Sequence, residues 1–112
     1  MTKTPAQIFE AAKALAGFAA ISADKALPTE VERGLDCGFA WVIVNPARGP
    51  FVAWCKANNI GHKHYKAGWE FWYSAFDPTN TQSISVHEAA AKAFAESLQS
   101  EGINASWGSR LD

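Results

Sequence analysis

The stretch DCGFAWVIV, residues 36–44, decides the fold. After its first residue it is an unbroken run of apolar, β-branched and aromatic residues, and Asn45-Pro46 ends it. Such a run is typical of a central β-strand covered on both faces, because a strand with one wet face alternates apolar and polar residues. We therefore expect residues 36–44 to form the strand around which the other elements assemble.

The sequence after this strand predicts a short helix and a hairpin. Pro50, which follows a glycine, can open a helix that closes near Asn58-Asn59 and carries Phe51, Trp54 and Cys55 on one face. The aromatic-rich stretches 62–66 and 69–76 are separated by Ala67-Gly68, which favours two antiparallel strands, although one long bent strand fits almost as well.

The C-terminal third of the chain predicts a helix and a last strand. Residues 85–88 (SVHE) form a capping box, and the apolar face that follows runs to Gln99, with Gly102 as a left-handed stop. Residues 103–107 are then expected to form a short strand, and residues 108–112 a tail.

Together, residues 36–112 predict the order β-α-β-β-α-β. This is the ferredoxin-like α+β sandwich, in which two helices cover one face of a four-stranded antiparallel sheet. A three-stranded α/β sheet is the alternative fold.

An N-terminal helical extension precedes this unit. Residues 4–7 (TPAQ) combine a capping hydroxyl, a proline at the first helical position and a glutamine three residues after the cap, which predicts a helix from Pro5 to about Ala20. The apolar stripe of this helix consists of Ile8, Ala12, Leu15 and Ala19. The stripe is thin, so we expect the helix to be an appendage that buries little. Residues 22–34 are expected to be a linker, which divides the chain into residues 1–35, helix and linker, and 36–112, the compact α+β domain.

Composition excludes several classes of function. The net charge is -1, so neither duplex DNA nor an anionic membrane is indicated as a partner, and no apolar run is long enough to span a bilayer. The two cysteines, Cys37 and Cys55, are too few for a disulfide framework, and we interpret both as buried thiols.

The chain shows no motif for catalysis or for a metal. No G-x-S-x-G elbow is present, and neither cysteine lies in a nucleophile motif. His62 and His64 alternate on a predicted strand without a third ligand nearby in the sequence, and His87 is expected at a solvated helix start. We therefore predict a protein that is not an enzyme and has no cofactor and no metal.

The aromatic residues are the strongest sign of binding. Five tryptophans occur in 112 residues, and both faces of the predicted strands carry aromatic side chains. Besides plain core packing, such a surface suits a dimer interface, a platform on which bases stack, or a pocket for a nucleotide. In a nucleotide pocket, the phosphate would bind Arg48, beside a helix start, or Arg110, in the tail. The candidate ligand-binding residues are Trp41, Arg48, Trp72, Tyr73 and Arg110.

Five short segments resemble small bacteriophage-encoded proteins of uncharacterised function. They are CGFAWV (37–42), QS (82–83), EA (88–89), AFA (93–95) and SRLD (109–112). The sequence departs from the pattern at Lys66-Ala67-Gly68, where a tyrosine followed by paired glycines is usual, which puts the hairpin geometry in question. The resemblance implies a protein of the infected bacterial cytoplasm, where phage accessory proteins bind a host protein or sequester a signalling molecule used in defence.

The sequence thus leads to a non-enzymatic phage accessory protein, a homodimer that captures a host factor or a nucleotide-like signalling molecule, with an anti-defence role. Two alternatives remain. One is a single-stranded nucleic-acid-binding protein that uses an aromatic sheet face. The other is a virion structural or assembly protein.

Overall fold

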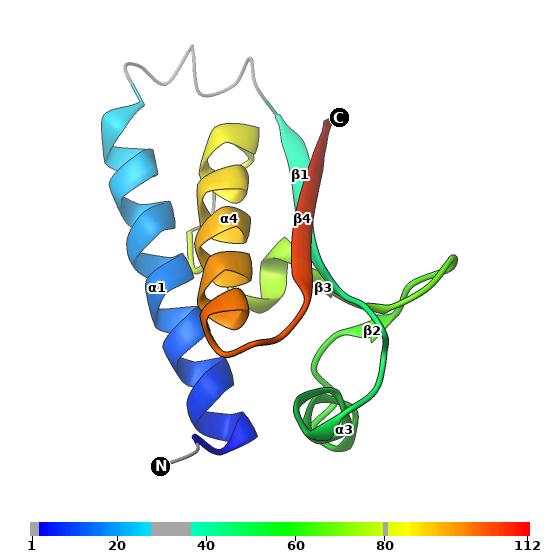
Figure 1. Ribbon diagram of the computed structural model, residues 1–112. Helices are drawn as coiled ribbons and strands as arrows, with labels where there is room; N and C mark the ends of the chain where they lie inside the picture. The colour runs from blue at the N-terminus through cyan, green and yellow to red at the C-terminus, as the bar shows by residue number, and fades with distance from the viewer. Residues whose placement is uncertain (1–2, 28–36, 80) are drawn as a thin grey trace.

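The computed structural model describes residues 3–27, 37–79 and 81–112, and these form a layer of helices against one antiparallel sheet (Figure 1). In chain order the elements are α1 (Pro5–Ala26), β1 (Gly38–Val44), α3 (Pro50–Ala57), β2 (His62–Lys63), β3 (Trp69–Trp72), the 3-10 turn η1 (Tyr73–Ala75), α4 (Ile84–Ser100) and β4 (Ala105–Leu111).

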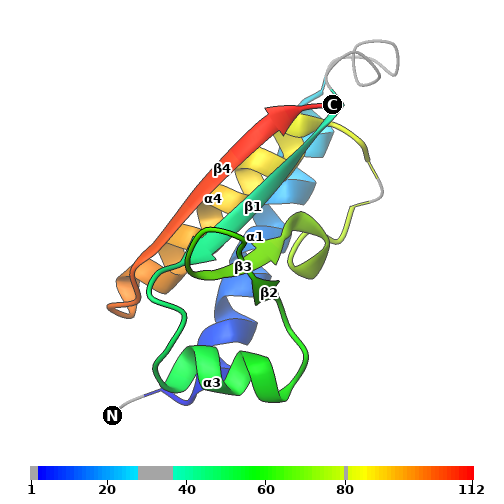
Figure 2. The ribbon, with the colours of Figure 1, turned by 90° about the vertical axis from the view of Figure 1, so that its right-hand side faces the viewer.

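The four strands lie in the order β2-β3-β1-β4, and every neighbouring pair is antiparallel. The α+β prediction is therefore confirmed, β1 is a central strand as expected, and the three-stranded alternative is wrong. Helices α1 and α4 lie side by side across one face of the sheet, whereas α3 lies beyond one end of it (Figure 2). The helix beside α4 is thus the N-terminal one and not the helix that follows β1.

Helix α1 begins as the sequence predicts but is longer and better packed. The Gln7 backbone N–H donates to Thr4 Oγ1 over 3.1 Å, and Thr4 N–H donates to Gln7 Oε1 over 2.9 Å, which completes the capping box. The helix continues to Ala26, so the first part of the expected linker is helical; residues 28–36, with the expected domain boundary, lie outside the described residues.

The buried stripe of α1 differs from the expected one. It consists of Phe9, Ala12, Ala16 and Ala20, which join the same core as the sheet residues. Three alanines allow α1 to approach α4 closely, so α1 is part of the core and the expectation of an appendage is wrong. The predicted stripe residue Leu15 is instead exposed, because the buried face of α1 passes through the next residue, Ala16.

Phe94 is the centre of the core between α4 and the sheet. Its ring contacts those of Phe9, Phe71 and Phe76, with centroids 6.0, 5.3 and 4.8 Å away. Phe94 is fully buried, and its partners come from α1, β3 and the segment after η1. One side chain thus joins four parts of the chain.

The end of α4 follows the sequence prediction, but its start does not. Gly102 has φ +79°, its N–H donates to Gln99 O, and Ile103 N–H donates to Leu98 O, which is the Schellman arrangement. The helix begins at Ile84, two residues before the expected position, because Ile84 and Val86 both pack in the interior. The expected capping glutamate, Glu88, instead accepts a hydrogen bond from the Ser109 hydroxyl.

The predicted C-terminal tail is mostly strand. Strand β4 pairs with β1 along its whole length, from Val44 opposite Ala105 to Gly38 opposite Leu111. A seven-residue central strand offers hydrogen-bonding groups along its full edge, and the chain satisfies them by extending β4 through residues 108–111. Arg110 is consequently fixed on a strand.

The hairpin prediction is confirmed, with shorter strands. His62 pairs with Glu70 in β2 and β3, and His64 N–H donates to Gly68 O across the turn. Gly68 has φ +100°, and a β-carbon there would lie 2.9 Å from Val44 O, so the turn requires glycine. Residues 73–75, expected to continue the strand, form η1 instead.

None of the described helices is both long enough and apolar enough to cross a membrane.

Candidate ligand-binding site

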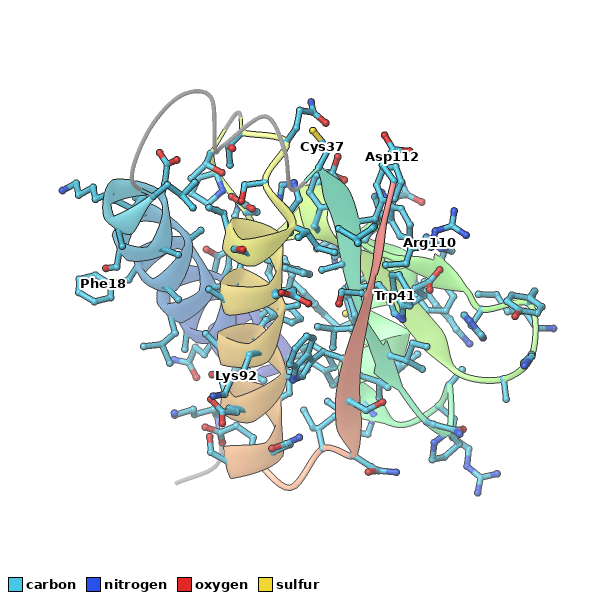
Figure 3. All side chains as sticks on the ribbon, turned by 90° about the horizontal axis from the view of Figure 1, so that it is seen from above. Phe18, Cys37, Trp41, Lys92, Arg110 and Asp112 are labelled. Atoms are coloured by element: carbon cyan, nitrogen blue, oxygen red, sulfur yellow. The ribbon has the colours of Figure 1, made fainter. Side chains whose placement is uncertain are left out.

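The sheet has one face that no described element covers. Ala40, Val42 and Val44 of β1 point toward the helices and are buried, so the alternate residues Phe39, Trp41 and Ile43 point the other way and are partly exposed. Figure 3 shows Trp41 and Arg110 on the side of the sheet that faces away from α1 and α4. The expectation that β1 is covered on both faces is therefore not met by the described part of the chain.

Trp41 and Trp72 form a nearly parallel pair on this face. They are direct partners in the register of β1 and β3, their ring centroids are 5.9 Å apart, and their planes differ by 7°. The Trp41 ring rests on Gly108 of β4, where a β-carbon would lie 3.0 Å from it. Phe39 extends the aromatic surface, with its centroid 5.6 Å from Trp72.

A pocket of about 270 Å³ opens over this pair. It brings together aromatic, acidic and basic side chains from the hairpin, β1 and β4, namely Trp41, His64, Tyr65, Glu70, Trp72 and Arg110. Arg110 lies with its guanidinium carbon 5.7 Å from the Phe39 ring centroid, and Tyr65, in the hairpin turn, is 84% exposed. The pocket is hence a flat aromatic surface with a cation at one side.

Glu70 is the acidic group of the pocket, and the sequence analysis missed it. Its carboxylate accepts a hydrogen bond from His62 Nε2 over 2.6 Å, and His64 Nε2 lies 3.8 Å from its other oxygen. The signal was available, because Glu70 lies two residues before Trp72 on a strand and so shares its face.

His62 and His64 both approach the Glu70 carboxylate, so the alternation of the two histidines does bring them to one group. Within residues 3–27, 37–79 and 81–112, however, no three or more histidine, cysteine or acidic side chains are placed to hold a metal ion. We assign His62, which is hydrogen-bonded to Glu70, to positioning the Glu70 carboxylate.

A second polar cluster lies inside the protein. His87 Nδ1 and Asp77 Oδ2 are 2.6 Å apart with both side chains fully buried, and the Tyr73 ring stacks on His87 at 3.9 Å. His87 Nε2 has no hydrogen-bond partner among the described groups. The expectation that His87 is at a solvated helix start is wrong, and its spacing from Ala90, Ala91 and Phe94 on one helical face indicates the burial.

The environment of Asp77 favours its ionised form. Burial raises the pKa of the carboxyl, but hydrogen bonds from His87 and Thr79, together with the charge of His87, outweigh burial and lower the pKa below its ordinary value. Thr79 contributes both its backbone N–H and its hydroxyl, at 2.9 and 2.7 Å. Because solvent does not reach the pair, we interpret it as structural, joining the segment after η1 to α4.

The two cysteines differ in their surroundings. Cys55 of α3 is buried, as expected, and burial raises the pKa of its thiol to about 12. Cys37 is only partly buried, next to the start of β1, so the expectation of two buried thiols holds for one of them.

Of the predicted ligand-binding residues, three line the pocket together: Trp41, Trp72 and Arg110. Tyr73 lies beside it, with its ring between Phe39 and His87. Arg48 lies elsewhere, in the loop before α3, where it lines a separate cavity. The tertiary structure therefore does not bring Arg48 to the aromatic site.

Two wider grooves, each of about 500 Å³, run along α1 and both include Glu10 and Lys13. Neither contains a parallel ring pair. The smaller aromatic pocket is the better candidate, because it combines stacking surface with convergent charged groups.

Comparisons with protein-family models, curated proteins and solved structures found no match to this chain. The fold and the site define it as an α+β protein with an aromatic pocket on the sheet face opposite its helices.

Proposed function

We propose that this chain is a non-enzymatic binding protein that holds a nucleotide-like ligand on Trp41 and Trp72. The observation that carries the proposal is the nearly parallel tryptophan pair, in a pocket that also contains the Arg110 guanidinium. Stacking a base on an aromatic ring contributes about 1–3 kcal/mol per base. Arginine adds hydrogen bonds matched to the geometry of phosphate.

The ring geometry indicates how the base would lie. Inserting a planar base between two rings requires roughly 7 Å, twice the contact distance of carbon atoms. The Trp41 and Trp72 centroids are 5.9 Å apart, so the two rings already contact each other. The base therefore stacks on their outer surface, in the pocket that Tyr65 of the hairpin turn also lines.

The proposed setting is the cytoplasm of an infected bacterium, where the protein would act as an accessory protein against host defence. Its support is the likeness of residues 37–42 and 109–112 to phage-encoded proteins. Those two segments form parts of β1 and β4 that carry Trp41 and Arg110. The resemblance and the proposed site therefore involve the same residues.

We also propose that the fold is a variant of the ferredoxin-like sandwich. The succession β1-α3-β2-β3-α4-β4 and the all-antiparallel sheet support this relation. The variation is that α1 takes the place beside α4.

A single-stranded nucleic acid is the second candidate ligand. Lys66 lies with Nζ 5.7 Å from the Tyr65 ring, so the aromatic face has a cation at the hairpin as well as at Arg110. A strand that follows this face would bind with an affinity that falls steeply as salt is added. A single nucleotide neutralises fewer charges and shows a weaker dependence on salt.

Native mass spectrometry of the protein purified from bacteria tests the proposal. We expect a species heavier than the chain by the mass of one nucleotide under gentle conditions, and the loss of that mass under denaturing conditions. Trp41→Ala should abolish the adduct, since the stacking surface is removed.

Trp107→Ala is the matched control. Trp107 is paired with Val42, so it lies on the helix side of β4 and should not affect the adduct. A Trp41→Ala protein that keeps its fold and the full adduct would contradict the proposal. Oligonucleotide masses in place of a mononucleotide would favour the second candidate.

The same spectra test the proposed homodimer. Leu15, Phe18 and Ile21 are exposed on α1, and Figure 3 shows Phe18 pointing away from α4. A second copy can cover this stripe with its own through a twofold axis, because such an interface pairs one patch with itself. We expect a dimer mass that Phe18→Asp reduces to a monomer, whereas Leu111→Asp, on exposed β4, leaves it unchanged. A dimer that survives Phe18→Asp would place the interface elsewhere, and large assemblies would favour a virion role.

A further inference from the structure

We propose that the base recognised in this pocket is guanine, and that Glu70 is the residue that selects it. This inference rests on the proposed nucleotide-binding function and adds the identity of the base.

Glu70 is placed at the edge of the stacking surface. It lies two residues before Trp72 on β3, so its side chain emerges from the same face about 7 Å along the strand. Its register partner in β1 is Ile43, two residues from Trp41. A base resting on the tryptophan pair therefore meets the Glu70 carboxylate edge-on, in the plane where its hydrogen-bonding groups point.

A carboxylate selects among the bases because it only accepts hydrogen bonds. Guanine presents two adjacent donors, N1–H and the N2 amino group, which match the two carboxylate oxygens. Adenine and cytosine each place one amino donor beside a ring nitrogen that accepts. Uracil has one N–H between two carbonyl oxygens. Only guanine can form two parallel hydrogen bonds with Glu70. Each of the other bases would bring an acceptor of its own against a carboxylate oxygen.

The carboxylate is held in position and retains capacity for a ligand. His62 Nε2 donates to one oxygen over 2.6 Å, which fixes the orientation of the group. His64 Nε2 is 3.8 Å from the other oxygen, beyond hydrogen-bonding distance. Two carboxylate oxygens offer about four acceptor positions, so both can still accept from a base. The Glu70 side chain is 12% exposed, consistent with a group at the wall of a pocket.

Arg110 is placed for the other end of the ligand. Glu70 is paired with Ile43 and Arg110 with Phe39, so the two positions are offset by four residues along β1, about 13 Å, and by two strands across the sheet, roughly 10 Å. The two backbone positions are thus about 16 Å apart along the diagonal. A base with its sugar and phosphate, met from both ends by the Glu70 and Arg110 side chains, can bridge that span, whereas a free base cannot. The site thus suits a guanine nucleotide with its base edge at Glu70 and its phosphate at Arg110.

Isothermal titration calorimetry with GMP, AMP, CMP and UMP tests the inference. We expect the wild-type protein to bind GMP at least about tenfold more tightly than the other three nucleotides, the usual effect of a well-placed bidentate contact. In Glu70→Gln, an amide donor faces the guanine donors, and we expect the GMP preference to fall below about threefold. Glu96→Gln, an exposed substitution on α4, should keep the preference of the wild type.

The outcomes separate the two proposals. If the wild type binds all four nucleotides equally, the guanine inference is overturned and the stacking function stands. If no nucleotide binds, the proposed function itself fails. If Glu70→Gln does not fold by circular dichroism, Glu70→Asp replaces it: withdrawing the carboxylate by one methylene should reduce the preference, and an unreduced preference would overturn the role of Glu70.

Discussion

Replacement of Asp77 by alanine is expected to lower the free energy of unfolding by about 3–5 kcal/mol, the usual cost of breaking a buried hydrogen-bonded network around a charged group. The Asp77 carboxylate accepts hydrogen bonds from His87 and from two groups of Thr79, and its side chain is fully buried. Alanine leaves these donors unsatisfied in the interior. Urea denaturation at neutral pH measures the change. The midpoint of the unfolding transition should fall, whereas the slope of the unfolding free energy against urea concentration should stay the same.

Two further variants check this result. Asp112→Ala removes an exposed carboxylate at the end of the chain and should change the stability by less than about 0.5 kcal/mol. Asp77→Asn keeps the size and one acceptor, so it should cost less than alanine and remain measurable if the alanine variant does not fold. An Asp77→Ala protein as stable as Asp112→Ala would show that the pair contributes nothing.

Acidification should remove the same contribution. The folded protein lowers the pKa of Asp77, so the stabilisation from its carboxylate is complete above the pKa of the unfolded chain and disappears as pH falls through the lower, folded value. Below about pH 4 the wild type should therefore lose stability more steeply than Asp77→Asn, which has no proton to gain at this position. Urea denaturation of both proteins at successive pH values measures this difference. If the unfolding free energies of the wild type and Asp77→Asn fall equally with pH, the lowered pKa of Asp77 is refuted.

Phe94→Ala is expected to lower the free energy of unfolding by about 3–5 kcal/mol, the cost of a large-to-small change in a packed core. The Phe94 ring contacts three other phenylalanine rings, and alanine would leave a cavity among elements that cannot all collapse into it. The midpoint of urea denaturation measures the loss. Phe94→Leu, which keeps most of the volume, provides a milder variant if Phe94→Ala does not fold.

Phe18→Ala is the matched control for this core substitution. Phe18 is 74% exposed on α1, so removing its ring from one chain should alter monomer stability little when the measurement is made at low protein concentration. Equal losses for the two phenylalanines would mean that Phe94 is not the centre of the core.

Local signals in the sequence determined much of the backbone. The capping box at residues 4–7, the apolar run that ends at Asn45-Pro46 and the glycine stop at Gly102 each act through neighbouring residues, and each predicted its element. Prediction was poorer where the length of an element depends on contacts with a segment far away in the sequence. The extension of β4 through Arg110 depends on the free edge of β1, some seventy residues earlier in the chain.

For the site, strand alternation alone places Trp41 on one face of β1 and Trp72 on one face of β3. Only the register of the two strands, which sets Trp41 opposite Trp72, brings the rings into contact and adds Arg110 from β4. The same register places Glu70 beside the pair, whereas Arg48, in the loop between β1 and α3, lies in a separate cavity.

The sequence by itself determined the order of the main helices and strands, the central strand and the aromatic character of the surface, because these depend on side chains close together in the chain. The tertiary structure alone decided that α1 packs beside α4, that Asp77 is the buried partner of His87, and that Arg110 joins the tryptophan pair. These are contacts between residues whose separation in the sequence carries no local signal, and they form only when the packing of the whole core fixes the strand register and the helix faces.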